Sequence, residues 1–176
     1  MEFIKTNIEG SYLIQLAKRE DDRGNLTRIF GKDEFKKVNI SNEIVQGYIS
    51  FTKNKGTIRG IHYQIKPQEM AQLTRVTRGS IYEVIVDVRP NSPTYLKWQG
   101  FKLSDSDMKS LYVPKGVAHG FLTLGDDVEF INLYTAPFTA ECEKGIRFND
   151  KKFNFDWPVA VEHVSEKDSS WPDFKS

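Results

Sequence analysis

Short apolar runs broken by turn residues dominate the chain from position 45 onward. The runs span about three to nine residues, are rich in β-branched and aromatic side chains, and are bounded by turn residues such as Gly and Pro, which is the pattern of strands joined by turns. A chain with many short strands of this kind folds as a β-sandwich or a β-barrel. The expected strands are 12–14, 45–51, 59–64, 72–77, 80–88, 98–103, 111–113, 119–124 and 128–135.

Two consecutive strands, 72–77 and 80–88, are expected to pair with each other. Only Arg78 and Gly79 separate them, a spacing typical of a β-hairpin. The second strand carries three apolar residues in succession at 84–86, which indicates that both of its faces are covered.

One short helix is expected, at 30–39. Asp33 and Glu34 stand near its start and Lys36 and Lys37 near its end, an arrangement that suits the helix dipole.

Length, charge and cysteine content narrow the class of protein. The 176 residues fit one domain with its own core, and the formal net charge of +1 gives no bulk attraction to nucleic acid or membrane. No apolar run reaches the ~18 residues of a membrane span, and Glu2 and Lys5 interrupt any signal-peptide pattern. The single Cys142 excludes an intrachain disulfide and agrees with a cytoplasmic location. An anionic ligand would therefore have to be bound by locally placed Arg and Lys.

Two short stretches carry the candidate chemistry. The strand RGIHYQ at 59–64 holds His62, and PKGVAHGF at 114–121 holds His119 after a Pro-Gly turn. His62 alone would be as consistent with a core histidine as with a site. A second histidine at the start of another strand favours a site.

These stretches stand in a longer series of motifs. The chain contains DRG at 22–24, RGIHYQ, RVTRG at 75–79, VDVR at 86–89, NSPT at 91–94, PKGVAHGF, KGIRF at 144–148 and SEKD at 165–168. In this order and spacing they resemble the dTDP-4-dehydrorhamnose 3,5-epimerase family, which are cupin-type sugar-nucleotide epimerases. The resemblance implies an all-β jelly roll with short peripheral helices. It also implies a single domain over 1–176, with an N-terminal strand arm and a C-terminal tail that folds back on the barrel.

The resemblance also assigns roles to residues. His62 matches the base that removes a proton next to the sugar ketone, and Asp168 matches its carboxylate partner. Such a pair fixes the histidine tautomer and stabilises the imidazolium. Matching positions for the substrate or its support are Arg23, Arg28, Gln46, Tyr48, Arg59, Gln64, Gln72, His119, Asn132, Phe138, Glu143 and Lys167. The charged stretch 18–24 is expected to be a turn from which Arg23 reaches the nucleotide, often across a subunit boundary.

The family has no cofactor and no metal, and it forms homodimers that share site residues. The alternative role for the histidines, a cupin metal site, wants His-x-His in the first motif, where this chain has His62-Tyr63-Gln64. The metal-independent interpretation is therefore adopted, with a sugar nucleotide as substrate and a second copy of the chain as partner.

Four positions depart from the family pattern. Gln72 replaces a lysine that helps to stabilise the enolate, and Asn132 replaces a tyrosine that donates the returning proton. Arg28 replaces a glutamate and Tyr48 an asparagine, which suggests altered recognition of the base or sugar. Residues two apart on a strand share a face, so Tyr134 is expected to supply the missing phenol as a third catalytic residue.

One geometric condition follows from the spacing of Arg59 and His62. Residues three apart on a regular strand point to opposite faces, so both reach one site only if the strand bulges at Gly60.

Three functions stay open at this point. The first is an epimerase acting at C3, C5 or both carbons of a nucleotide-linked 4-keto-6-deoxy sugar, for deoxysugar and surface polysaccharide synthesis. The second is a 3,4-ketoisomerase on a similar substrate, and the third is a sugar-nucleotide-binding protein without turnover. The nucleotide (dTDP, GDP, UDP or CDP) and the sugar are not determined by the sequence.

Overall fold

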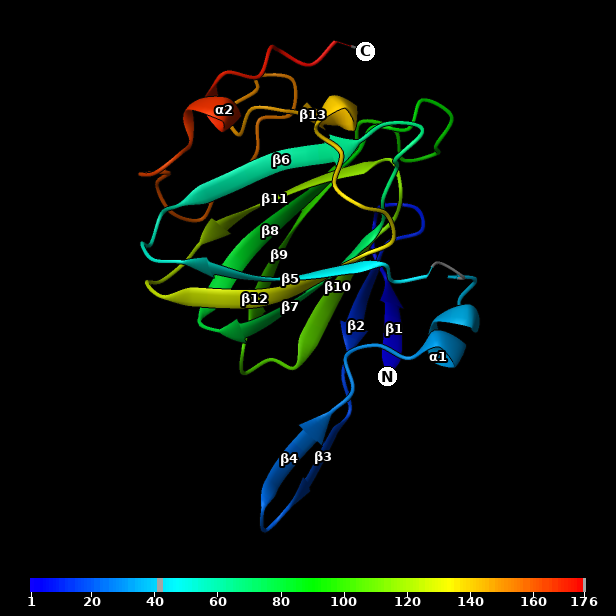
Figure 1. Cartoon of the computed structure of the whole chain (residues 1–176). Helices are drawn as coiled ribbons and strands as arrows, with labels where there is room; N and C mark the ends of the chain where they lie inside the picture. Colours follow the sequence, from blue (N-terminus) through cyan, green and yellow to red (C-terminus); the bar gives the residue numbers. More distant parts are fainter. Residues whose placement is uncertain (41–42, 176) are drawn as a thin grey trace.

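The computed structural model describes residues 1–40 and 43–175, and in these residues two antiparallel sheets pack face to face (Figure 1). The six-stranded sheet has the order β1 (Glu2–Lys5), β2 (Tyr12–Gln15), β10 (Lys109–Val113), β7 (Gln72–Arg78), β12 (Val128–Tyr134), β5 (Gln46–Thr52). The five-stranded sheet has the order β13 (Glu143–Gly145), β6 (Ile58–Gln64), β11 (Val117–Thr123), β8 (Ser80–Asp87), β9 (Trp98–Ser104). The remaining elements are the hairpin β3 (Lys18–Asp21) and β4 (Gly24–Thr27), the helices α1 (Lys32–Lys36) and α2 (Glu166–Ser169), and a 3-10 turn at Ala140–Cys142.

The all-β sandwich expected from the apolar runs is confirmed. Each expected strand is present, with ends that differ by a few residues. The interior between the sheets holds Val76 and Phe130 from one sheet and Ile81, Ile85 and Phe121 from the other, all less than 9% exposed.

The run 84–86 is covered on both faces, as expected for β8. Ile85 packs into the interior between the sheets, while Val84 and Val86 pack on the outer face against a second cluster that includes Phe153. The C-terminal part of the chain therefore acts as an outer layer over the five-stranded sheet.

The expected hairpin between 72–77 and 80–88 is wrong. β7 pairs with β10 and β12 in one sheet, while β8 pairs with β11 and β9 in the other. Gly79, at φ +75°, lies where the chain passes from one sheet to the other. A two-residue link can join strands of two facing sheets as well as strands of one ladder, and burial of both apolar faces favours the crossing here.

Two expectations near the N-terminus need correction. The helix spans only Lys32–Lys36, shorter than 30–39, and Asn39 adopts φ +63°, which is incompatible with a continuing helix. The charged stretch 18–24 is not a simple turn, because Lys18–Asp21 forms strand β3, which pairs with β4. Figure 1 shows this hairpin projecting away from the sandwich.

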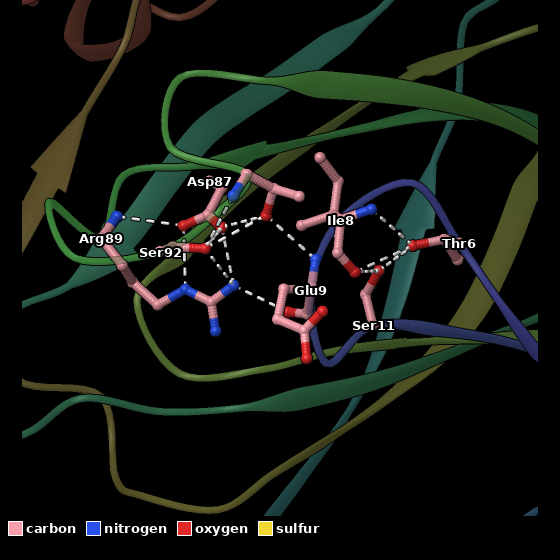
Figure 2. A network of polar contacts seen from close by, with 8 residues as sticks. Thr6, Ile8, Glu9, Ser11, Asp87, Arg89 and Ser92 are labelled. Atoms are coloured by element: carbon pink, nitrogen blue, oxygen red, sulfur yellow. Dashed lines mark hydrogen bonds and ion pairs between the residues drawn. The ribbon is translucent and has the colours of Figure 1, made fainter.

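A buried ion pair fastens the loop after β8. The Asp87 carboxylate is fully buried and accepts from Arg89 Nε at 2.8 Å, Arg89 Nη2 at 2.7 Å and Ser92 Oγ at 2.5 Å (Figure 2). Arg89 Nη2 also donates to the Glu9 carbonyl at 2.7 Å, which ties the β1–β2 turn to the same loop. Because burial alone would raise the pKa of Asp87, its lowered pKa reflects the donors around it.

No helix within the described residues is long and apolar enough to cross a membrane.

Candidate active site

A pocket of about 520 Å³ opens between the two sheets, at the end where β5 and β12 face β6 and β11. Aromatic and apolar side chains from β5 and β12 form one wall, and Arg59, His62 and His119 come from the other. The full lining is Tyr48, Ile49, Ser50, Phe51, Arg59, His62, Tyr63, Gln64, Met70, His119, Phe121, Phe130, Asn132, Tyr134, Phe138 and Glu143.

A bulge in β6 brings Arg59 and His62 to this pocket, as the sequence required. The register with β11 shifts at this point, since His119 pairs with His62 but Gly120 pairs with Gly60. Gly60 has φ +103°, and an added Cβ would lie 2.7 Å from the Gly120 Cα. Only glycine fits this position, because both the backbone angle and the close approach exclude a side chain.

Asp168 lies against His62, although 106 positions separate them in the sequence. The Asp168 Oδ1 is 2.6 Å from the His62 Nε2, and its Oδ2 accepts from the Gly60 backbone N–H at 3.3 Å. The Ser165 hydroxyl caps α2 by accepting from the Asp168 N–H at 3.0 Å, which fixes the helix that carries the carboxylate. α2 packs on β6, so the tail folds back over the strand that bears His62 (Figure 1).

The Asp168 carboxyl is ionised more readily than an exposed one. Burial works to raise its pKa, but the hydrogen bond and charge of His62, with the Gly60 and Ser165 contacts, hold it below the ordinary value of 3.8. With Nε2 bound to this carboxylate, the other nitrogen Nδ1 is left for chemistry. It lies 3.8 Å from the Glu143 Oε1, and both His62 and Glu143 line the pocket.

Beneath His119 lies a polar cluster that the pocket does not expose. The Gln72 Nε2 is 2.7 Å from the His119 Nδ1 and 3.1 Å from the Glu83 Oε1. Glu83 is 1% exposed, and its Oε1 also accepts from the Thr74 hydroxyl at 3.3 Å. No lysine or arginine takes part in these contacts. Gln72 places a neutral amide at the position that is lysine in the resembled family.

On the opposite wall Asn132 and Tyr134 share a face, as expected for residues two apart on a strand. The Asn132 Nδ2 donates to the Tyr134 hydroxyl oxygen at 2.9 Å. Burial raises the pKa of Tyr134 to about 12. The phenol therefore keeps its proton at neutral pH. Because its oxygen accepts from Asn132, its O–H can donate to another group.

Two cations flank the His62 side of the site. Arg59 lines the pocket and makes no hydrogen bond or ion pair among the described residues, while the Lys167 Nζ is 2.5 Å from the Glu143 Oε2. Lys167 also stands 6.0 Å from the centre of the Phe138 ring, which is 49% exposed. A flat aromatic face beside two cations suits a ligand with a ring and a diphosphate.

Three further predicted residues form or support the walls. Gln64 is 2% exposed and uses its amide on the backbone of Gln68, Pro137 and Thr139, so it holds the loops of the site. Gln46 holds the Tyr48 hydroxyl and accepts from the Phe138 N–H at 3.1 Å.

Arg23 and Arg28 are not brought to this pocket within the chain. The Arg23 side chain is 85% exposed at the tip of the β3–β4 hairpin, where it pairs with Asp21. Arg28 pairs with Glu34 at 3.3 Å and lines a separate small cavity near α1.

Sequence reasoning missed Glu83 and Trp171. Glu83 is the one acid in the otherwise apolar run 81–86, and a carboxylate inside a strand with two covered faces was the available signal. Trp171 lies edge-on to His62, with ring centres 6.4 Å apart, and its ring occupies the space beside Gly145. No sequence pattern marks that contact.

In the part of the chain that the structure describes, no three His, Cys, Asp or Glu side chains gather in a way that could hold a metal ion. Independence from metal stays a prediction.

Comparison with known proteins decides the family. The sequence profile of the dTDP-4-dehydrorhamnose 3,5-epimerase family matches residues 5–176. The chain belongs to this family. It is 39% identical over 173 residues to the dTDP-4-dehydrorhamnose 3,5-epimerase of Sinorhizobium fredii, covering 98% of this chain and 89% of the relative.

A solved structure of the Bacillus anthracis enzyme of the same name, with TDP and pyrophosphate bound, superposes with a TM-score of 0.94 at 35% identity. That match covers 98% of this chain and 99% of the other. The chain is also 30% identical over 162 residues to the dTDP-4-dehydrorhamnose 3-epimerase of Streptomyces niveus, covering 92% of this chain and 78% of the relative. Members of the dTDP-4-dehydrorhamnose 3,5-epimerase family are isomerases, so the expectation of an enzyme of this class is confirmed.

Proposed function

We propose that the chain epimerises a nucleotide-linked 4-keto-6-deoxy sugar, with a dTDP sugar as the first candidate substrate. The contact between His62, at the pocket wall, and the buried Asp168 is the observation that carries this proposal. A neutral imidazole backed by a carboxylate can act as the general base that removes the proton next to a ketone.

The proton is taken by His62 Nδ1 in this mechanism. Asp168 accepts from Nε2, holds the ring in one tautomer and balances the positive charge that develops on the imidazole. The electron pair of the broken C–H bond forms a C=C bond to the ketone carbon, and the C=O π pair moves onto the ketone oxygen, which becomes the enolate oxygen.

Inversion requires that the proton return from the other side. His62 stands on β6 of the five-stranded sheet, whereas Tyr134 stands on β12 of the six-stranded sheet, and both line the pocket. Tyr134 is therefore the proposed acid, directly or through a water, in place of the tyrosine missing at Asn132. Base and acid on facing walls support an epimerase, because inversion at one carbon takes a proton from one face and returns a proton to the other.

The nucleotide and its diphosphate are proposed to lie along Arg59, Lys167 and Phe138. The outlying Arg23 and Arg28 join a site only if the β3–β4 hairpin of a second copy reaches it. Two exposed apolar residues support such a homodimer: Leu26 on the hairpin is 71% exposed, and Ile49 on the edge strand β5 is 72% exposed. Light scattering that gives a monomer at micromolar concentration would remove this part of the proposal. A cytoplasmic location also remains a proposal, supported by the single Cys142.

Proton NMR in deuterated water tests the function. The purified chain is incubated with dTDP-4-keto-6-deoxyglucose, and deuterium entry at C3 and C5, inversion and carbonyl position are followed. Entry with inversion at either carbon is expected. A carbonyl moved to C3 would show a ketoisomerase, and tight binding without exchange would show a binding protein.

The matched variants are His62→Asn and His163→Asn. The first is expected to lower exchange by about 10²–10⁴-fold, the usual cost of losing a general base. The second changes an exposed histidine and is expected to leave exchange unchanged. Equal rates in the two variants would contradict His62 as the base.

A further inference from the structure

The cluster beneath His119 fixes which nitrogen of that ring carries a proton. One Gln72 nitrogen, Nε2, lies 3.1 Å from the Glu83 Oε1 and 2.7 Å from the His119 Nδ1. All three residues are buried or nearly so: Gln72 is 3% and Glu83 1% exposed, and the His119 side chain is 17% exposed.

The orientation of the Gln72 amide follows from Glu83. In the structure the Gln72 NH₂ group is turned toward Glu83, whose carboxylate oxygen accepts from it, and the reverse orientation would set the Gln72 carbonyl oxygen against that acceptor. The NH₂ group has two hydrogens, one for the Glu83 Oε1 and one for the His119 Nδ1. The His119 Nδ1 therefore accepts, and the single ring proton of the uncharged imidazole resides on Nε2.

That proton is available to a ligand. His119 lines the pocket, and its Nε2 has no hydrogen-bond partner among the described residues. His119 is also the direct cross-strand neighbour of His62 in the β6–β11 ladder. Directly opposed residues share a face of the sheet, so both rings are presented to the same bound molecule.

We propose that His119 donates its Nε2–H to the enolate oxygen formed when His62 removes the proton, and that Gln72 and Glu83 are positioning residues that hold this tautomer. The proposal rests on the proposed epimerase function. No proton is transferred by His119 in this step: the electron pair from the C–H bond is delocalised onto oxygen, and the N–H···O hydrogen bond strengthens as the charge grows. His119 thus stabilises the enolate oxygen, a role that the resembled family gives to a lysine at position 72.

The tautomer is tested by nitrogen-15 NMR of the imidazole rings, which needs no substrate. The chain has three histidines, so the His62→Asn and His163→Asn variants assign every ring. For His119 we expect an unprotonated Nδ1 and a protonated Nε2. A protonated Nδ1 in the wild-type chain would overturn the proposal.

Two substitutions at position 72 test the positioning role. Gln72→Lys keeps a donor that cannot accept, and Nδ1 is expected to remain unprotonated. Gln72→Leu removes the donor. The His119 Nδ1, which is 3.4 Å from the Glu83 Oε1 in the wild-type structure, is then expected to carry a proton and donate it to that oxygen in a hydrogen bond. The same spectrum for both variants would show that Gln72 only fills space.

Two substitutions at position 119 test the catalytic role. Glutamine places its amide nitrogen near the position of the histidine Nε2, whereas asparagine places it near Nδ1. His119→Asn is expected to lower substrate-proton exchange by about 10²–10³-fold, the usual cost of losing one oxyanion donor, and His119→Gln by clearly less. Equal losses in the two variants would overturn the role. If the wild-type chain exchanges no proton with any 4-keto sugar, the proposed function fails and the catalytic role fails with it, while the NMR result on the tautomer still stands.

Discussion

Asp168→Asn is the sharpest test of the proposed base, because it removes one charge and almost no volume. The carboxylate is 4% exposed, and its contact with His62 Nε2 at 2.6 Å is short enough for a charge-assisted hydrogen bond. Asparagine keeps an oxygen for that hydrogen bond but cannot balance the positive charge of the imidazolium formed during proton removal.

The size of the expected loss in exchange rate follows from the hydrogen bond between Asp168 and His62. A hydrogen bond to a charged partner contributes about 1.5–3 kcal/mol. At about 1.4 kcal/mol for each tenfold change in rate, the loss is about 10- to 150-fold in substrate-proton exchange. Ligand binding should change little, because the Asp168 side chain lies behind His62 and does not line the main pocket.

The assay is deuterium exchange at C3 and C5 under single-turnover conditions, with the dissociation constant of dTDP measured alongside. Glu166→Gln is the matched control, since it makes the same change from acid to amide on an exposed residue of the same helix α2. Exchange in Asp168→Asn within about threefold of the control would refute the reasoning. The carboxylate would then be only an anchor for α2, and the base would lie elsewhere.

Three further predictions concern other parts of the fold. Tyr134→Phe should keep exchange but lower inversion, and an unchanged ratio of exchange to product would make Tyr134 a packing residue. Asp87→Asn should lower the free energy of unfolding at neutral pH by about 3 kcal/mol, near the low end for a broken buried ion pair, because the partner guanidinium is partly exposed. Since the folded pKa of Asp87 is below 3.8, the wild type should lose this stability as pH falls through that pKa, and urea midpoints of the two proteins should converge in acid. Gly60→Ala should cost about 3 kcal/mol or more, from a Cβ 2.7 Å from the Gly120 Cα at positive φ, whereas Gly24→Ala, with open space around it, should cost only the backbone strain.

The order of apolar and turn residues was enough to place nine strands, β2 and β5 to β12, but it did not reveal β1, β3, β4 or β13. Period-two spacing also placed Asn132 and Tyr134 on one face, and the three-residue spacing of Arg59 and His62 correctly required a bulge at Gly60. These features are local: they depend on strand periodicity and on the backbone freedom of glycine, which a sequence displays directly.

The partners of each strand were decided only by the tertiary structure. The segments 72–77 and 80–88 have the spacing of a hairpin, yet β7 and β8 lie in different sheets, because each finds its ladder with strands far along the chain. Turn chemistry fixes where the chain reverses. Which apolar faces then cover one another depends on the whole sandwich.

The polar partners of the site also depended on the tertiary structure. Asp168 was expected from the family resemblance, and nothing in its own surroundings distinguished it from a surface carboxylate until α2 packed on β6. Glu83 is visible in the sequence as an acid within an apolar strand. Its contacts with Gln72 and His119, which come from two other strands, are visible only in the structure. Apolar periodicity can be read directly from the sequence. A buried charge, in contrast, forms its hydrogen bonds with segments that only folding brings beside it.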